Sequence, residues 1–167
     1  GFLADLGAVG IEPSAWCPLV LGAGGAARAV TYALGIAGAR VVYLLARTPA
    51  KAEALASDLQ QRGEVRIVVG RLPEDVERFL PAINLVVHVD ASPWPESVPL
   101  RSDMAVYDLV YNPMETRLLH QARRAGARAI SGLGMLVQQG AAAFRLWTGQ
   151  EPPTEVMRKV CEEKMRG

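Results

Sequence analysis

The chain has few of the residues that build metal sites or disulfide frameworks. Among its 167 residues are two cysteines and two histidines. Cys17 and Cys161 lie far apart and belong to no C-x-x-C pair, and His88 and His120 are isolated from other ligand types. This spacing argues against a disulfide and against a zinc site. We therefore expect no metal, two cysteines that behave as small buried residues, and a solvated His120.

An excess of one charge sign is also lacking. Lys and Arg number 18 and Asp and Glu number 17, so the formal net charge is +1 at pH 7. The charges are interspersed, which gives no electrostatic basis for binding nucleic acid or a membrane surface. The sequence contains no long apolar segment and no basic-then-apolar leader. We expect a soluble, cytoplasmic protein with neither nucleic acid nor membrane as a partner.

The chain does not begin with methionine. It starts at Gly1, where an amphipathic helical pattern is already under way, and we interpret it as a fragment of a longer protein. Hydrophobic residues make up 50% of the sequence, which is ample for a single core. Residues 1–167 are therefore expected to form one domain.

Apolar runs alternate with helical patterns along the whole sequence. The expected strands are residues 18–21, 40–45, 64–69, 84–89, 104–110 and 127–130. The expected helices are residues 25–36, 49–61, 72–80, 117–125, 135–148 and a last one that starts at 152 or 153 and ends near 166. The strands are mostly apolar, as parallel strands covered on both faces are. This alternation predicts an α/β fold, a doubly wound (Rossmann-type) parallel sheet of about six strands with helices on both faces.

The last two helices are expected to bury their apolar side chains. The residues expected to be mostly core or to face inward are Met135, Leu136, Phe144, Trp147, Val156, Met157 and Val160. The charged face of the final helix is expected to be solvated.

A glycine turn follows the first apolar strand and opens the first long helix. Gly22, Gly24 and Ala27 match the dinucleotide-binding fingerprint G-x-G-x-x-A. Gly22 makes the turn, Gly24 allows the backbone to approach a pyrophosphate, and Ala27 keeps helix and sheet close. The first helical N–H groups then point at the phosphates. The alternative is a glycine turn that only packs.

The end of the second strand carries basic residues where NAD-binding domains usually have an acidic one. Arg47 and Lys51 lie there with Thr48 between them. A guanidinium, an ammonium and a hydroxyl suit a 2′-phosphate, so the sequence predicts NADP as the cofactor. Thr48 is also expected to cap the helix that Pro49 begins, and this leaves Arg47 available.

A proline-rich loop over residues 90–99 leaves the carboxyl end of the fourth strand, where open α/β sheets bind ligands. His88 and Trp94 are candidates either for lining a cofactor site or for packing. The sequence leaves both interpretations open.

Five stretches together resemble the shikimate dehydrogenase family, and the resemblance covers essentially the whole chain. They are Gly1-Phe2, residues 22–29, the segment from Ala46 to Lys51, the D-x-x-Y-x-P-x-x-T element of residues 108–116, and residues 132–149. The resemblance is to the NADP-binding domain of that family. It implies hydride transfer between NADP and shikimate or 3-dehydroshikimate, in aromatic amino acid biosynthesis.

The resemblance also implies a set of site residues. Those implied to bind the cofactor are Gly22, Ala23, Gly24, Gly25, Ala26, Arg47, Thr48, Lys51, Leu109, Gly132 and Met135. Tyr111 and Gln139 are implied to contact the substrate's hydroxyl groups, which agrees with a polar side chain just past a strand end and another on a facing helix. The family's catalytic lysine and aspartate belong to a first domain that this sequence lacks. We expect no catalytic residue in this chain and no turnover without that domain.

Two positions depart from the family pattern. Ala46 stands where the family usually has asparagine, and the family's N-x-T-x-x-G loop is replaced by residues 88–93, which include Asp90. An aspartate beside phosphates is repulsive, so Asp90 either points away or weakens the site. Two alternatives therefore stay open, a dinucleotide-binding module without catalysis and a related dehydrogenase acting on quinate or an aminated analogue.

Overall fold

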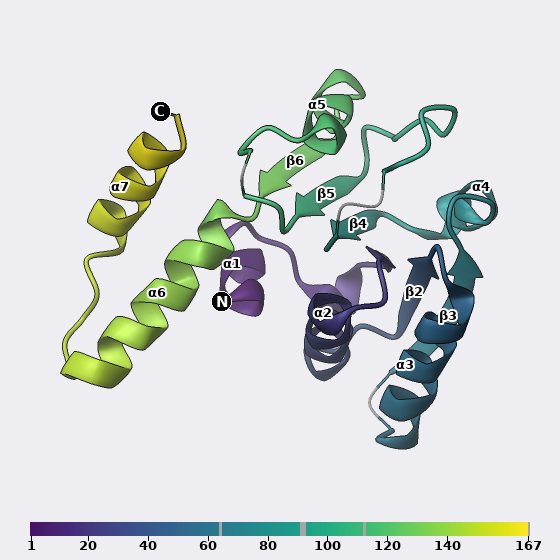
Figure 1. Ribbon diagram of the computed structural model, residues 1–167, viewed down its shortest axis with the longest axis horizontal. Coiled ribbons are helices and arrows are strands. Elements are labelled where there is room, and N and C mark those ends of the chain that lie inside the picture. Colours follow the sequence, from purple (N-terminus) through teal and green to yellow (C-terminus); the bar gives the residue numbers. More distant parts are fainter. Residues whose placement is uncertain (64, 91–92, 112, 167) are drawn as a thin grey trace.

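Six parallel strands form one sheet in the described part of the chain (Figure 1). The computed structural model describes residues 1–63, 65–90, 93–111 and 113–166. The strands are β1 (Pro18–Leu21), β2 (Val41–Ala46), β3 (Arg66–Arg71), β4 (Leu85–His88), β5 (Ala105–Asp108) and β6 (Arg128–Ser131). Their order across the sheet is β3-β2-β1-β4-β5-β6. The chain adds strands on one side of β1 up to β3, then crosses back and adds β4 to β6 on the other side, so the strand order reverses between the neighbouring strands β1 and β4. This order confirms the predicted doubly wound fold.

Helices cover both faces of the sheet. The helices are α1 (Phe2–Ala8), α2 (Gly25–Ile36), α3 (Pro49–Gln61), α4 (Val76–Phe79), α5 (Arg117–Arg124), α6 (Leu133–Thr148) and α7 (Thr154–Arg166), with short 3-10 turns at Pro13–Ala15 and Leu80–Ala82. No helix among the described residues is both long and apolar enough to cross a membrane.

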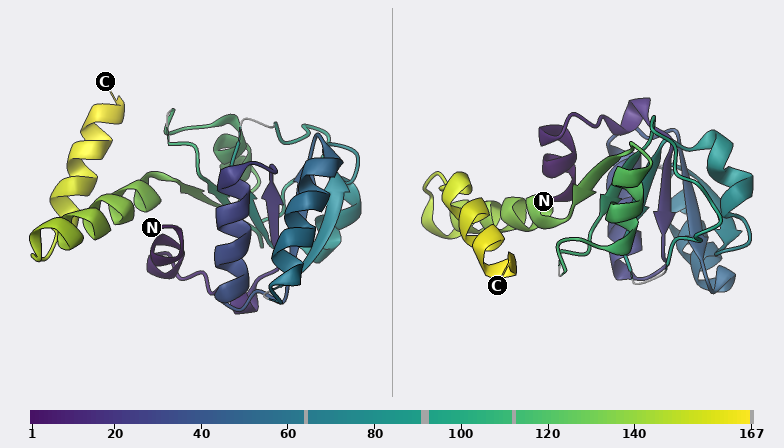
Figure 2. Two further views of the ribbon diagram at one scale, coloured as in Figure 1. Left: turned by 60° about the horizontal axis from the view of Figure 1, so that its bottom comes forward. Right: turned by 90° about the horizontal axis from the view of Figure 1, so that it is seen from above.

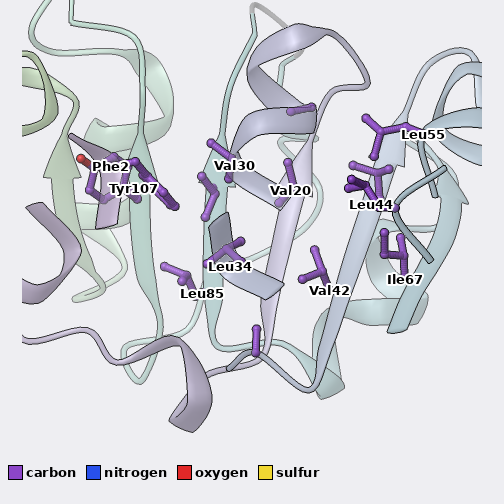
Figure 3. Close-up of a cluster of buried hydrophobic side chains, with 14 of the residues drawn as sticks. Phe2, Val20, Val30, Leu34, Val42, Leu44, Leu55, Ile67, Leu85 and Tyr107 are labelled. Carbon is purple, nitrogen blue, oxygen red and sulfur yellow. The ribbon is translucent and has the colours of Figure 1, made fainter. Parts of the chain in front are cut away.

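The strands bury alternate side chains in two separate cores. In β1, Val20 packs with α1, α2 and α3 on one face, and Figure 3 shows this cluster around Val20, Leu44 and Leu34. Leu19 and Leu21 face the other way and pack with α4 and α5. All four residues of β1 are buried, because successive side chains of a central strand enter opposite cores.

The region after β3 differs from the sequence prediction. The strand extends to Arg71, two residues further than expected, and the helix expected over 72–80 begins only at Val76. The Asp75 carboxylate accepts a hydrogen bond from the backbone N–H of Arg71 at 2.7 Å, which closes a turn in place of the first helical turn. Gly70 permits the strand because an added Cβ would lie 2.5 Å from the Phe79 ring.

The carboxyl-terminal arm is less buried than the sequence suggested. Figure 2 shows α6 and α7 extending away from the sheet. Trp147 is 80% exposed, and Val156 and Val160 are 59% and 53% exposed, so the expectation that they are core residues was wrong. The second half of α6 lies beyond the sheet, and α7 packs against α6, so too few elements surround these positions to bury them.

The two cysteines and His120 differ in how well their predicted burial agrees with the structure. Cys17 and Cys161 are free and only half-buried, so the prediction that both are buried was wrong. His120 is exposed on α5, as expected.

A buried polar contact joins α1 to the sheet and to α6. The Tyr107 hydroxyl donates a hydrogen bond to the Asp5 carboxylate at 2.6 Å, and Phe2 contacts the Tyr107 ring edge-on at 5.2 Å. Asp5 also fills the space beside Gly134 in the first turn of α6, where an added Cβ would overlap its carboxylate. Burial and the neighbouring Asp5 raise the pKa of Tyr107 well above its ordinary value.

This contact predicts a loss of stability in alkali. The Tyr107 phenol stays neutral in the folded protein while an unfolded tyrosine ionises near pH 10, so above that pH this residue lowers the free energy of unfolding by about 1.4 kcal/mol per pH unit. Tyr107→Phe removes that slope and costs about 1–3 kcal/mol at pH 8 through the lost hydrogen bond. Urea unfolding between pH 8 and 11 measures both effects.

Tyr32→Phe is the matched control, because Tyr32 is 39% exposed. The control should keep the wild-type pH dependence. An unchanged alkaline slope in Tyr107→Phe would contradict this interpretation of the buried pair.

Candidate functional site

The glycine turn lies at the carboxyl end of β1, where the strand order reverses. Gly22 has φ of +124°, and its N–H donates to the Leu45 carbonyl at 2.8 Å. A Cβ at Gly22 would lie 2.7 Å from Asp90 Oδ2 and 2.9 Å from Val89 Cγ2. Both the backbone conformation and the space therefore require glycine.

The next residues present the start of α2 to the surface. Gly24, Gly25 and Ala26 are exposed, whereas Ala27 is fully buried against the sheet. No side chain among the described residues caps α2, and an added Cβ at Gly24 or Gly25 would meet no described atom within 4 Å. The first N–H groups of α2 thus have no side-chain cap among the described residues, and Gly24 beside them lines a cavity, as suits an anion-binding helix terminus.

A polar cavity of about 280 Å³ lies beside this turn, at the ends of β1, β2 and β4. It is lined by Ala23, Gly24, Ala46, Arg47, Thr48, Lys51 and Asp90. The structure therefore brings the glycine loop together with the three residues predicted to hold a 2′-phosphate. It also places the Asp90 side chain at this cavity rather than away from it.

Thr48 fulfils its predicted position but not its predicted contact. It is the residue before α3, and Pro49 is the first residue of the helix. Its hydroxyl caps no N–H group in the described part of the chain, so the expected side-chain cap was wrong. The Thr48 carbonyl accepts the first hydrogen bond instead, from the Lys51 N–H at 3.1 Å.

An apolar cavity of about 330 Å³ adjoins the polar one and shares Arg47 with it. Its lining residues are Arg47, Leu72, Pro73, Pro93, Trp94, Pro95, Glu96 and Arg117. Trp94 is held in place because its indole N–H donates to the Val98 carbonyl at 2.8 Å. Arg117 and Glu96 form an ion pair at this cavity. Sequence reasoning left Trp94 undecided and missed the prolines as lining residues, although the proline-rich loop at a strand end was the available signal.

Buried hydrogen bonds fix the ends of β4 and β5. The Asp108 carboxylate contacts His88 Nδ1 at 2.9 Å and accepts hydrogen bonds from the Val110 N–H at 3.0 Å and the Thr116 hydroxyl at 2.5 Å. Thr116 in turn accepts from the Leu119 N–H, which caps α5. His88 is therefore a buried packing and hydrogen-bonding residue that lines neither cavity, which decides between the two interpretations left open for it.

The remaining predicted site residues make up a second group by position, on the segments that follow β5 and β6. Gly132, the residue before α6, lies so close to Leu109 that an added Cβ would be 2.5 Å from the Leu109 carbonyl oxygen. Leu109 and Met135 pack at the margin of the first core. Tyr111 is 40% exposed and Gln139 is exposed. None of these five residues lines the polar cavity beside the glycine turn, although both groups follow the carboxyl ends of strands of one sheet.

The reversal of strand order between β1 and β4 and the glycine turn beside it define the class of the protein. This arrangement is a Rossmann-type α/β domain, a class that binds dinucleotides at the carboxyl edge of the sheet.

Comparisons with known proteins relate the chain to the shikimate dehydrogenases. A family model described as the shikimate 5′-dehydrogenase C-terminal domain matches residues 132–162. The NADP(+)-dependent shikimate dehydrogenase of Moorella thermoacetica is 47% identical over 99% of the chain and 59% of its own length. The chain is therefore similar to shikimate dehydrogenases over almost its whole length, and it spans somewhat more than half of such relatives.

Solved structures agree with this assignment. The shikimate 5-dehydrogenase of Thermus thermophilus, solved with NADP(H) and shikimate, is 39% identical and superposes with a TM-score of 0.80 over 97% of this chain and 60% of its own. The quinate dehydrogenase of Corynebacterium glutamicum, solved with NAD, is 30% identical with a TM-score of 0.81 over 95% of this chain and 59% of its own.

Because Gly132 lies so close to Leu109, replacement by alanine is expected to change the free energy of unfolding in opposite directions at Gly132 and at Gly140. Gly132→Ala should lower the free energy of unfolding by about 1–3 kcal/mol, because the new methyl group overpacks the backbone of Leu109. Gly140→Ala, within α6, should raise it by up to about 1 kcal/mol, since its Cβ would meet nothing nearer than Met157 at 4.0 Å. Urea unfolding of both variants measures the difference. Equal effects would contradict the steric role of Gly132.

Proposed function

We propose that this chain is the NADP-binding domain of a shikimate dehydrogenase, which reduces 3-dehydroshikimate to shikimate. The observation that carries the proposal is the polar cavity in which the glycine loop meets Arg47, Thr48 and Lys51. The NADP(+)-dependent relatives support the choice of cofactor and reaction.

The residues present suit each part of an NADP molecule. The open start of α2 suits the diphosphate, because its N–H groups and the helix dipole attract anions. Arg47 and Lys51 suit the 2′-phosphate through charge-assisted hydrogen bonds. The adjoining apolar cavity suits the adenine ring, with Arg47 between the two cavities. Ala46 offers no polar group at this point, so the ribose depends on its neighbours.

The second group of residues is proposed to bind the reacting end of the cofactor and the substrate. Leu109, Gly132 and Met135 would form the surface against the nicotinamide, and Tyr111 and Gln139 would donate or accept hydrogen bonds with substrate hydroxyls. NADPH supplies the hydride when bound, and this chain's residues supply its orientation. We assign no proton transfer to any residue of this chain.

A further domain is proposed to complete the site. The Moorella relative extends beyond the matched region. Gly1 lies against α6, where an added Cβ would be 2.5 Å from the Gln139 side chain. Leu146 and Trp147 leave an apolar surface on the arm, 82% and 80% exposed. We propose that the catalytic lysine and aspartate belong to that further domain.

A quinate or aminoshikimate dehydrogenase is the second candidate, since the quinate dehydrogenase structure fits equally well. That enzyme was solved with NAD, whereas Arg47 and Lys51 at the cavity favour a phosphorylated ribose. A dinucleotide-binding module without catalysis is the third. The cytoplasmic location expected from the sequence stays a prediction.

Arg47→Ala tests the cofactor assignment. Calorimetric titration should show that the chain prefers NADP over NAD by at least about tenfold, and that the variant loses this preference, because the 2′-phosphate loses a charge-assisted contact. Arg66→Ala is the control, since Arg66 is exposed at the opposite, amino end of β3. A preference for NADP that survives in Arg47→Ala would contradict the proposed role.

A chimera tests the reaction. In it, the chain replaces the matching part of the Moorella enzyme, and the expected activity is NADP-dependent oxidation of shikimate. Gln139→Ala in this chimera should raise the KM for shikimate by about tenfold, as expected for one lost hydrogen bond, without changing the KM for NADP. A folded chimera that binds NADP but turns over quinate instead would favour the second candidate. One that turns over neither compound would favour the third.

A further inference from the structure

Asp90 is the one acidic residue among the described residues that line the polar cavity. It follows β4, whose last residue His88 pairs with Leu21 at the end of β1. The Val89 N–H donates to the Leu21 carbonyl at 3.3 Å, which holds this segment beside the glycine turn. Asp90 Oδ2 lies where a side chain at Gly22 would otherwise be.

The cavity therefore joins charges of both signs. Arg47 and Lys51 carry positive charge, and the Asp90 carboxylate faces the same space of about 280 Å³. The screening length at physiological salt is about 8 Å, so charges that line one cavity of this size act on one another. A carboxylate repels phosphate groups, but it accepts hydrogen bonds from a ribose hydroxyl.

We propose that Asp90 is a specificity-determining residue of the cofactor cavity, one that reduces the preference for NADP over NAD. Its carboxylate opposes the 2′-phosphate that Arg47 and Lys51 attract. When the ribose is unphosphorylated, the same carboxylate accepts a hydrogen bond from the hydroxyl. The inference rests on the proposed function, because it assumes that the cavity holds the adenosine ribose.

The test compares the 167-residue chain with Asp90→Asn and Asp90→Ser, which remove the charge while keeping a small polar side chain. Calorimetric titration with NADP and with NAD should show NADP binding at least about tenfold more tightly to both variants, as expected from the loss of one nearby like charge. NAD binding should be unchanged or weaker, so the NADP-to-NAD ratio rises. The gain should shrink in 1 M salt, where charge interactions are screened.

Asp103→Asn is the control, since Asp103 is paired with Arg101 at the amino end of β5. It should leave both affinities unchanged. Equal changes for NADP and NAD, or weaker NADP binding in Asp90→Asn and Asp90→Ser, would overturn the inference while leaving the proposed function intact. Absence of binding to the chain and to both Asp90 variants would overturn both.

Discussion

The carboxyl edge of the sheet depends on one steric constraint, the lack of a side chain at Gly22. The turn after β1 and the segment after β4 leave neighbouring strands at the place where the strand order reverses. They share a space so narrow that a Cβ at Gly22 would overlap Val89 and Asp90. The same segment brings Asp90 to the cavity that Gly24, Arg47 and Lys51 also line.

The two halves of the site are held by different means. The end of β1 is fixed by backbone geometry, with the Gly22 N–H bound to β2. The end of β5 is fixed by the buried Asp108 carboxylate, which joins β4, the segment that follows β5 and the start of α5 through three side-chain and backbone contacts. Such a network orients the segment that carries Leu109 and Tyr111. The two halves meet at one edge because all strands of the sheet are parallel.

The sequence predicted most of the fold because local patterns and the final packing agree in the sheet. Apolar strands, the glycine turn and the Thr48-Pro49 helix start all have local signals, and the structure has each of these elements, although β3 ends two residues later than expected. Trp147 and Val160 were assigned to the core because their apolar character does not reveal that α6 extends beyond the sheet. The partners of His88 and Asp5 were also missed, since contacts between residues 20 and 102 positions apart leave no local pattern. For the same reason, the sequence alone does not show that the prolines around Trp94 line a cavity.

The central claim is that an NADP molecule lies across the two adjoining cavities at this edge. A crystal structure of the chain grown with NADP tests it most directly. The account predicts the 2′-phosphate between Arg47 and Lys51, the diphosphate over Gly24 at the start of α2, and the adenine against Trp94 and Pro73. A nucleotide bound elsewhere, or one whose 2′-phosphate points away from Arg47, would contradict the account.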